Sequence, residues 1–176
     1  MRMRTMCVAA GLMMVMSAVP ALAQGPAAVP ERHGFWVNFG MGYGSLGCDN
    51  CDGREGGLSG NLSLGGTVND HLLLGVGTTG WVKETLGERL TAGTFDFRVR
   101  VYPVRTSGFF ITGGLGAGSV SYADENELGV GVVIGVGWDL RVGRNISLTP
   151  FYNGFAMRNE NVDANVGQIG IGVSFH

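Results

Sequence analysis

Two cysteines separated by two residues, Cys48 and Cys51, form the motif with the widest range of possible chemistry. This spacing can hold a local disulfide, half of a metal site or a redox-active pair. A zinc site needs two further ligands, and the long polar connections of this chain contain no other Cys and no His. A thioredoxin-like pair needs a βαβ setting, which the sequence does not show. We therefore expect a disulfide between Cys48 and Cys51 that tightens its loop, with metal binding and redox chemistry as alternatives.

The same segment partly imitates a calcium-binding loop, with Asn50, Asp52 and Gly53 at its third, fifth and sixth positions. The first and twelfth positions, however, hold Cys48 and Ser59 in place of the required Asp and Glu. No EF-hand site is expected.

Charged residues at every second position form another candidate site. Asp96, Arg98 and Arg100 share one parity, and Asp139 and Arg141 repeat the pattern. If both segments are strands, each set points to one face, where opposite charges can neutralise one another. The five residues are expected to form an ion-pair cluster, either as structural neutralisation or as a plug or gate.

Catalytic signatures are missing from the sequence. It contains no G-x-S-x-G, Walker A or dinucleotide fingerprint in a suitable setting. Its three histidines, His33, His71 and His176, all fall at the end of the short turns, where we expect ordinary exposed side chains, with a metal site at that rim as the alternative. We expect no enzyme, no catalytic residue, no metal and no cofactor.

Eight segments alternate apolar with small or polar residues, which is the period of a β-strand. In the clearest of them, Val130, Val132 and Ile134 share a face opposite Gly131 and Gly135. One segment is ambiguous, because its aromatic residues disagree in parity and it contains a proline. The eight segments are 35–44, 58–68, 72–83, 93–102, 109–119, 130–142, 146–157 (the ambiguous one) and 166–176.

The connections between these segments alternate in length. The short ones are 69–71, 104–107 and 143–145, and the longer polar ones are 46–57, 84–90, 121–128 and 159–165. This order predicts an all-β fold, an antiparallel up-and-down barrel of eight strands, with both chain ends at the rim of the short turns.

The composition of the two faces decides the environment of the barrel. The less apolar face carries mainly Gly, Ser, Thr and Asn, whereas a solvated sheet face normally carries many charges. Small polar residues suit a narrow lumen enclosed by eight strands. We therefore expect the apolar face to point outward to lipid and the charged cluster to lie in the lumen. A soluble lipocalin-like ligand-binding barrel, with the faces reversed, is the alternative.

The first 23 residues combine two arginines, an apolar stretch and Ala21-Leu22-Ala23, which predicts a cleaved signal peptide. A short periplasmic segment, 24–33, and the barrel, 34–176, follow. The whole chain has a net charge of −2 and 15% charged residues, which argues against binding nucleic acid. Its 32 glycines have no three-residue period and 45% of its residues are hydrophobic, so it is neither collagenous nor disordered.

Aromatic residues near the strand ends are expected to form two girdles at the membrane interfaces. They are Phe35, Tyr43, Tyr102, Phe109, Trp138 and Phe175.

The signal ending, the alternating strands and the C-terminal Ile169-x-Ile171-x-Val173-x-Phe175 together resemble small outer-membrane β-barrel proteins of Gram-negative bacteria. The likeness is to the OmpA-like transmembrane domain and the outer membrane protein beta-barrel domain family. It implies an outer-membrane location and recognition by the barrel assembly machinery.

From this resemblance we expect a monomeric barrel with a structural or surface-interaction role and a narrow polar lumen closed by ion pairs. A small-solute, porin-like channel is the alternative. Acidic residues outnumber basic ones in the long connections, so their rim could share divalent cations with the phosphates of lipopolysaccharide.

Overall fold

The computed structural model describes residues 32–48, 53–85, 88–122, 125–160 and 163–176. The expected signal peptide, most of the segment 24–33, and Cys51 lie outside the described residues. Strands follow the alternating segments, with these bounds: β1 (Phe35–Cys48), β2 (Glu55–Asn69), β3 (Leu72–Thr85), β4 (Glu88–Val101), β5 (Phe109–Tyr122), β6 (Glu125–Trp138), β7 (Leu140–Arg141), β8 (Ile146–Arg158) and β9 (Asp163–Phe175).

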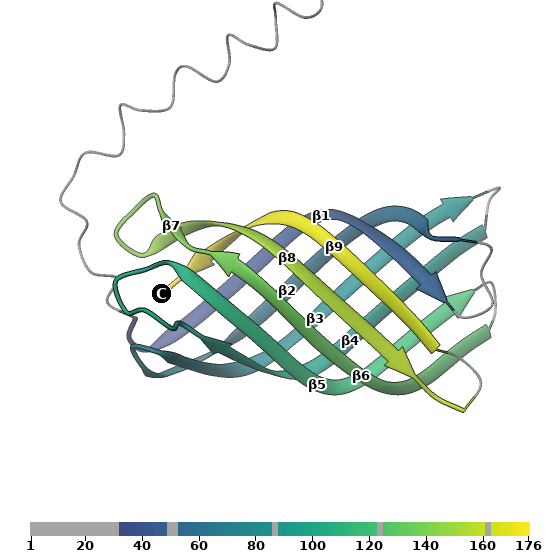
Figure 1. The fold of residues 1–176 in the computed structure, drawn as a ribbon, viewed down its shortest axis with the longest axis horizontal. Helices are drawn as coiled ribbons and strands as arrows, with labels where there is room; N and C mark the ends of the chain where they lie inside the picture. Colours follow the sequence, from purple (N-terminus) through teal and green to yellow (C-terminus); the bar gives the residue numbers. More distant parts are fainter. Residues whose placement is uncertain (1–31, 49–52, 86–87, 123–124, 161–162) are drawn as a thin grey trace, which may run out of the picture.

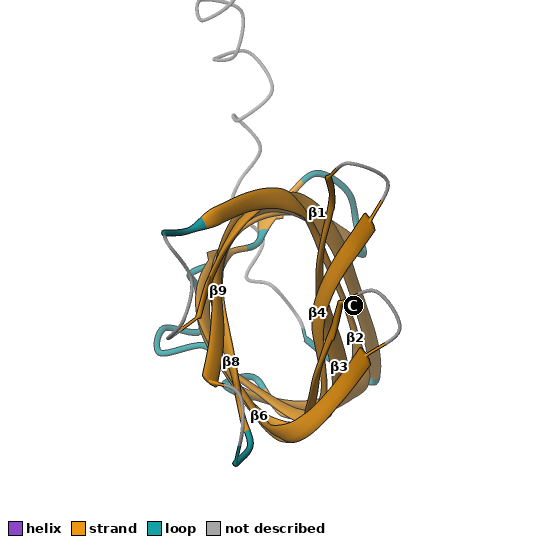
Figure 2. Cartoon of the chain, turned by 90° about the vertical axis from the view of Figure 1, so that its right-hand side faces the viewer, coloured by secondary structure: helices purple, strands orange, loops and turns teal. Residues whose placement is uncertain are grey.

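The strands close into a barrel (Figures 1 and 2). Neighbouring strands pair antiparallel in the order β6-β5-β4-β3-β2-β1-β9-β8, and β6 pairs with β8 to complete the circle. The two-residue β7 continues the wall of β6, because Leu140 faces Leu148 in the same register as Gly137 faces Phe151. The predicted eight-stranded up-and-down barrel is confirmed. Its described residues include no helix long and apolar enough to cross a membrane.

The apolar side chains point outward, as the composition of the two faces predicts. Met41 and Phe97 are each 77% exposed, whereas the inward-facing Trp36 is fully buried. Burying so many exposed apolar side chains requires a lipid environment, so the alternative of a soluble barrel with an apolar interior is wrong.

The structure also resolves the ambiguous segment 146–157. In β8, Phe151 and Phe155 point into the barrel, and Tyr152 points outward. Pro150 lies one residue beyond the last pair between β6 and β8, where its missing N–H interrupts no pairing with β6.

The strands extend further toward the rim of the long connections than the sequence predicts. β3 and β4 pair up to Thr85 and Glu88, and β5 and β6 up to Tyr122 and Glu125. The predicted connections 84–90 and 121–128 are therefore mostly strand. Their Ser, Asn and Glu residues suggest turns, but the ladder bonds use only the backbone and accept such side chains wherever one face is solvated.

Candidate functional site

The interior of the barrel brings together the charged residues that the sequence singles out. β4 runs toward the rim that carries both chain ends and presents Asp96, Arg98 and Arg100 in succession on its inner face. All three are at most 3% exposed. A buried charge in a narrow lumen is tolerated only with partners, so the contacts of these side chains decide what the lumen can do.

Asp96 and Arg98 form a bidentate ion pair with each other. Arg98 Nε donates to Asp96 Oδ1 at 2.7 Å, and Arg98 Nη2 donates to Asp96 Oδ2 at 2.6 Å. The guanidinium also donates to the hydroxyls of Ser63 and Thr79, at 3.2 and 3.0 Å. Charge-assisted bonds of this kind are short and directional. The ion pair is thus anchored to β2 and β3 across the lumen.

Two glycines make room for this ion pair. A Cβ atom on Gly77 would lie 2.7 Å from Arg98 Cζ, and one on Gly114 would lie 2.2 Å from Asp96 Oδ1. Both distances are shorter than real contacts. A side chain at either of these wall positions would therefore force the ion pair to shift.

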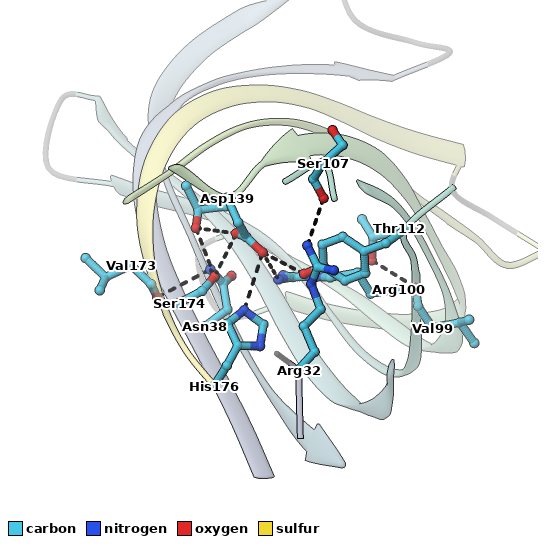
Figure 3. A network of polar contacts seen from close by, with 12 residues as sticks. Arg32, Asn38, Val99, Arg100, Ser107, Thr112, Asp139, Val173, Ser174 and His176 are labelled. Carbon is cyan, nitrogen blue, oxygen red and sulfur yellow. Dashed lines mark hydrogen bonds and ion pairs between the residues drawn. The ribbon is translucent and has the colours of Figure 1, made fainter. Parts of the chain in front are cut away.

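A second cluster surrounds Asp139, which lies between β6 and β7 and points into the barrel (Figure 3). Its carboxylate accepts hydrogen bonds from the Tyr102 hydroxyl at 2.6 Å, the Thr149 hydroxyl at 2.7 Å and the Ser174 hydroxyl at 3.2 Å. His176 Nε2 lies 3.4 Å from it. Asp139 thereby links the ends of β4, β8 and β9.

Arg100 completes this second cluster. Its Nη1 atom lies 3.9 Å from Asp139 Oδ2, and its Cζ atom lies 4.0 Å from the Phe110 ring centroid and 4.8 Å from that of Trp36. Cation–π contact of this kind stabilises a guanidinium away from water. Arg100 is therefore held by one carboxylate and two aromatic faces.

The electrostatics of the cluster follow from burial and hydrogen bonding. Burial raises the pKa of Tyr102 to about 12, with Arg100 opposing and Asp139 reinforcing the shift. Burial alone would also raise the pKa of Asp139. The contact with His176, the charge of Arg100 and the hydrogen bonds from Tyr102 and Thr149 outweigh it and hold the Asp139 pKa well below its usual range. Tyr102 thus remains a neutral donor to an ionised Asp139.

Arg32 covers this cluster at the mouth of the barrel (Figure 3). It is 1% exposed, and its Cζ atom lies 3.6 Å from the centroid of the Tyr102 ring. Its guanidinium donates to the backbone carbonyls of Arg105 at 3.2 Å and Ser107 at 2.8 Å, both in the turn after β4. The residues just before β1 therefore fold back into the mouth, which no sequence pattern indicates.

The other half of the lumen holds an apolar cluster beside buried polar side chains such as Ser59 and Gln168, so it is less polar than the sequence predicts. Seven inward-facing residues form one buried cluster there: Leu46, Trp81, Ala92, Val133, Phe155, Ala164 and Val166. Trp81 Nε1 donates to the carbonyl of Gly44 at 3.1 Å, so its single polar atom is satisfied. The sequence does not indicate this cluster, because small polar residues dominate the inner face as a whole.

Two of the expected site residues lie elsewhere. Arg141 is exposed in β7 and is not part of the lumenal cluster, because it lies next to the turn in which Val142 N donates to Ile146 O, at the rim of the barrel. Tyr102 is fully buried in the lumen and is not part of a girdle. Tyr102 follows Arg100 by two residues, so the alternation that points Arg100 into the lumen points Tyr102 there as well. Its place near the end of a strand favours the girdle assignment and hides this spacing.

The remaining girdle residues lie on the outer surface. Phe35, Tyr43, Trp138 and Phe175 are exposed and Phe109 is partly exposed. Phe109 and Trp138 pack with ring centroids 6.0 Å apart, and Phe39 and Phe175 with centroids 6.2 Å apart.

Cys48 ends β1 and is disulfide-bonded. Its pairing with Cys51 remains a prediction, because Cys51 lies outside the described residues. No group of three or more His, Cys, Asp or Glu side chains that could hold a metal ion occurs in the part of the chain that the structure describes.

Comparison with known proteins decides the family. The model of the outer membrane protein beta-barrel domain matches residues 9–175. The chain belongs to the outer membrane protein beta-barrel domain family. Members of this family are outer-membrane proteins of Gram-negative bacteria, and this barrel has the same location.

Solved structures of outer-membrane barrels share its fold. Neisserial surface protein A is 20% identical, covers 83% of this chain and 99% of its own, and has a TM-score of 0.61. Ail, the attachment invasion locus protein of Yersinia pestis, is 13% identical, with coverages of 81% and 99% and a TM-score of 0.58. The N-terminal barrel of Pseudomonas aeruginosa OprF is 13% identical, with coverages of 82% and 100% and a TM-score of 0.51. A search of curated protein sequences finds no match.

Proposed function

We propose that this outer-membrane barrel is closed to solutes and acts through its surfaces, in a structural or surface-interaction role. The observation that carries the proposal is the filling of the lumen by side chains in three successive layers. These are the apolar cluster around Trp81, the Asp96–Arg98 ion pair, and the Asp139 cluster covered by Arg32. A cavity of about 10 Å³ beside Arg100 has room for one water molecule.

Liposome swelling tests the closed lumen against the porin-like alternative. We expect proteoliposomes with the full mature chain to swell in small sugars no faster than protein-free liposomes. The double variant Trp81→Ala, Phe155→Ala removes two large side chains from the apolar layer and serves as the control for partial opening. Swelling by the unaltered barrel at a porin-like rate would refute the proposal.

The barrel is proposed to be oriented with both chain ends in the periplasm, as in other outer-membrane barrels with short periplasmic turns. The opposite, extracellular rim then carries acidic side chains, of which Glu55 is paired with Lys83, and Asp163 lies 3.6 Å from Arg158. Sharing divalent cations with lipopolysaccharide phosphates is consistent with this rim. Chelation by EDTA is expected to weaken retention of lipopolysaccharide by the purified barrel.

The remaining partners are proposed from the same features. The outward-facing Ile169, Ile171 and Phe175 of β9 fit recognition by the barrel assembly machinery. The pairing of β6 with β8 closes the ladder along the described part of the barrel, so little strand edge is left there to pair with a second copy, which supports a monomer. No catalytic role, cofactor or nucleic-acid partner is proposed.

A further inference from the structure

β8 and β9 lie side by side in the wall of the barrel (Figure 1). The outer surface of the wall is hollowed along this pair of strands. Gly154 and Gly167 face each other across these two strands and form the floor of a groove of about 610 Å³. Tyr43, Tyr152 and Ile169 line the groove, and each is more than half exposed. Since Tyr43, Tyr152 and Ile169 stand around it, this facing pair of glycines leaves a recess in the surface that meets the lipid.

The recess continues toward the periplasmic rim as a second groove of about 590 Å³. The two grooves share Tyr152 and Ile169, and the second runs past Pro150 to Trp138. Gly154 and Pro150 are four residues apart on β8, which corresponds to roughly 13 Å of strand. A long, apolar recess of this shape suits an extended hydrocarbon chain.

A fixed positive charge stands at the extracellular end of the recess. Arg54 Nε donates to Ser45 Oγ at 3.0 Å and Arg54 Nη1 donates to Asn165 Oδ1 at 2.8 Å, and all three residues line the groove. Arg54 Nη2 also donates to the Ser45 carbonyl at 2.5 Å. These acceptors are neutral, and Arg54 takes part in no ion pair with the described residues. The guanidinium is thus oriented, and no carboxylate among the described residues pairs with it.

We propose that this groove is a binding site for lipid A, the phosphorylated and acylated anchor of lipopolysaccharide. An acyl chain would lie on Gly154 and Gly167, and a phosphate would contact Arg54. Charge-assisted contact between guanidinium and phosphate is strong and geometrically specific. The choice of lipid A over a phospholipid rests on the proposed orientation of the barrel, which places Arg54 in the outer leaflet.

The test is binding of purified bisphosphorylated, hexa-acylated lipid A to the refolded mature chain in detergent, measured by native mass spectrometry with EDTA present. EDTA removes any contact bridged by divalent cations, so that only the groove is measured. We expect Gly154→Leu and Arg54→Gln each to weaken binding about tenfold, and Arg54→Lys to restore part of it.

Gly80→Leu, in β3 on another side of the barrel, is the matched control for Gly154→Leu. A Cβ atom on Gly154 would meet its nearest neighbour at 3.8 Å, and one on Gly80, which also faces outward, would meet nothing within 4 Å. A Cβ atom at either position therefore meets no close neighbour, and only Gly154 lines the groove. Gly80→Leu is expected to bind lipid A like the unaltered chain, and a heat-dependent gel shift checks that each variant is folded.

Equal binding by all variants, or equally tight binding of phosphatidylglycerol, would overturn the groove proposal. If Gly154→Leu does not fold, Arg54→Gln alone decides, because it adds no bulk. The liposome swelling assay is independent of these measurements. If the barrel conducts solutes but these substitutions still weaken lipid A binding, the closed lumen is contradicted and the groove is still supported as the binding site.

Discussion

The buried ion pair between Asp96 and Arg98 makes the sharpest prediction for stability. Their side chains are at most 2% exposed, and two parallel hydrogen bonds join them. Removing one partner from such a pair leaves an uncompensated charge in a low-dielectric interior, which costs about 3–5 kcal/mol. Replacing both partners by apolar side chains of similar shape removes the attraction and the desolvation cost together. The double variant should therefore lose far less stability than the sum of the two single variants.

The measurement is a double-mutant cycle with Asp96→Leu, Arg98→Met and the double variant. Urea unfolding of the barrel from phospholipid vesicles, followed by tryptophan fluorescence, gives the free energy of each protein. We expect each single variant to lose about 3–5 kcal/mol, with a coupling energy of several kcal/mol.

The exposed pair Lys83–Glu55 at the opposite rim provides the control, because solvent screens it and its coupling should be about 0–1 kcal/mol. Additive effects at Asp96 and Arg98, or single losses below about 1 kcal/mol, would refute the account of a charge-neutralised lumen.

Further predictions follow from the lipid face and from the Asp139 cluster. Arg at Leu62, midway along β2, should cost about 2–4 kcal/mol, whereas Arg at Val68, on the same face near the strand end, should cost about 0–1 kcal/mol, as measured by refolding into vesicles. Since the Tyr102 pKa is raised to about 12, its contribution is complete below pH 10 and is lost as pH rises from about 10 to 12. Tyr102→Phe should flatten the alkaline decline in the free energy of unfolding, and an unchanged decline would contradict the assignment. The Asp139 pKa is lowered, so its contribution is present above about pH 4 and lost at more acidic pH. Asp139→Asn should be less stable at pH 7 and lose less on acidification, which acid unfolding curves would show.

The sequence predicts the wall of the barrel well because each strand position faces either lipid or lumen. Phe97 and Ile134 follow this alternation directly. Tyr102 does too, although its place near a strand end made the girdle assignment look reasonable. Successive side chains of a strand point to opposite faces, so the sequence alone predicts which residues face lipid and which face the lumen.

The contents of the lumen are harder to predict because they depend on which inward side chains meet across the barrel. Phe155 belongs to the segment whose parity was ambiguous, and it shares a buried cluster with Trp81, which lies in a strand far away in the sequence. Arg32 precedes the first strand and reaches carbonyls more than 70 residues away, at Arg105 and Ser107. No local pattern records such a contact. Arg141 shows the opposite case. Its spacing in the sequence predicts that it points into the lumen, but it lies beyond the enclosed part of the barrel.

The pairing of β3 with β4 up to Thr85 and Glu88 has a consequence for how such a protein can change. The ladder between these two strands holds this part of the wall together up to its extracellular end. Lengthening a flexible loop costs only about 0.6 kcal/mol for each doubling of its length. New peptide sequence can therefore be carried at this rim without redesigning the barrel, which makes the molecule a ready scaffold for displaying foreign epitopes on a cell surface.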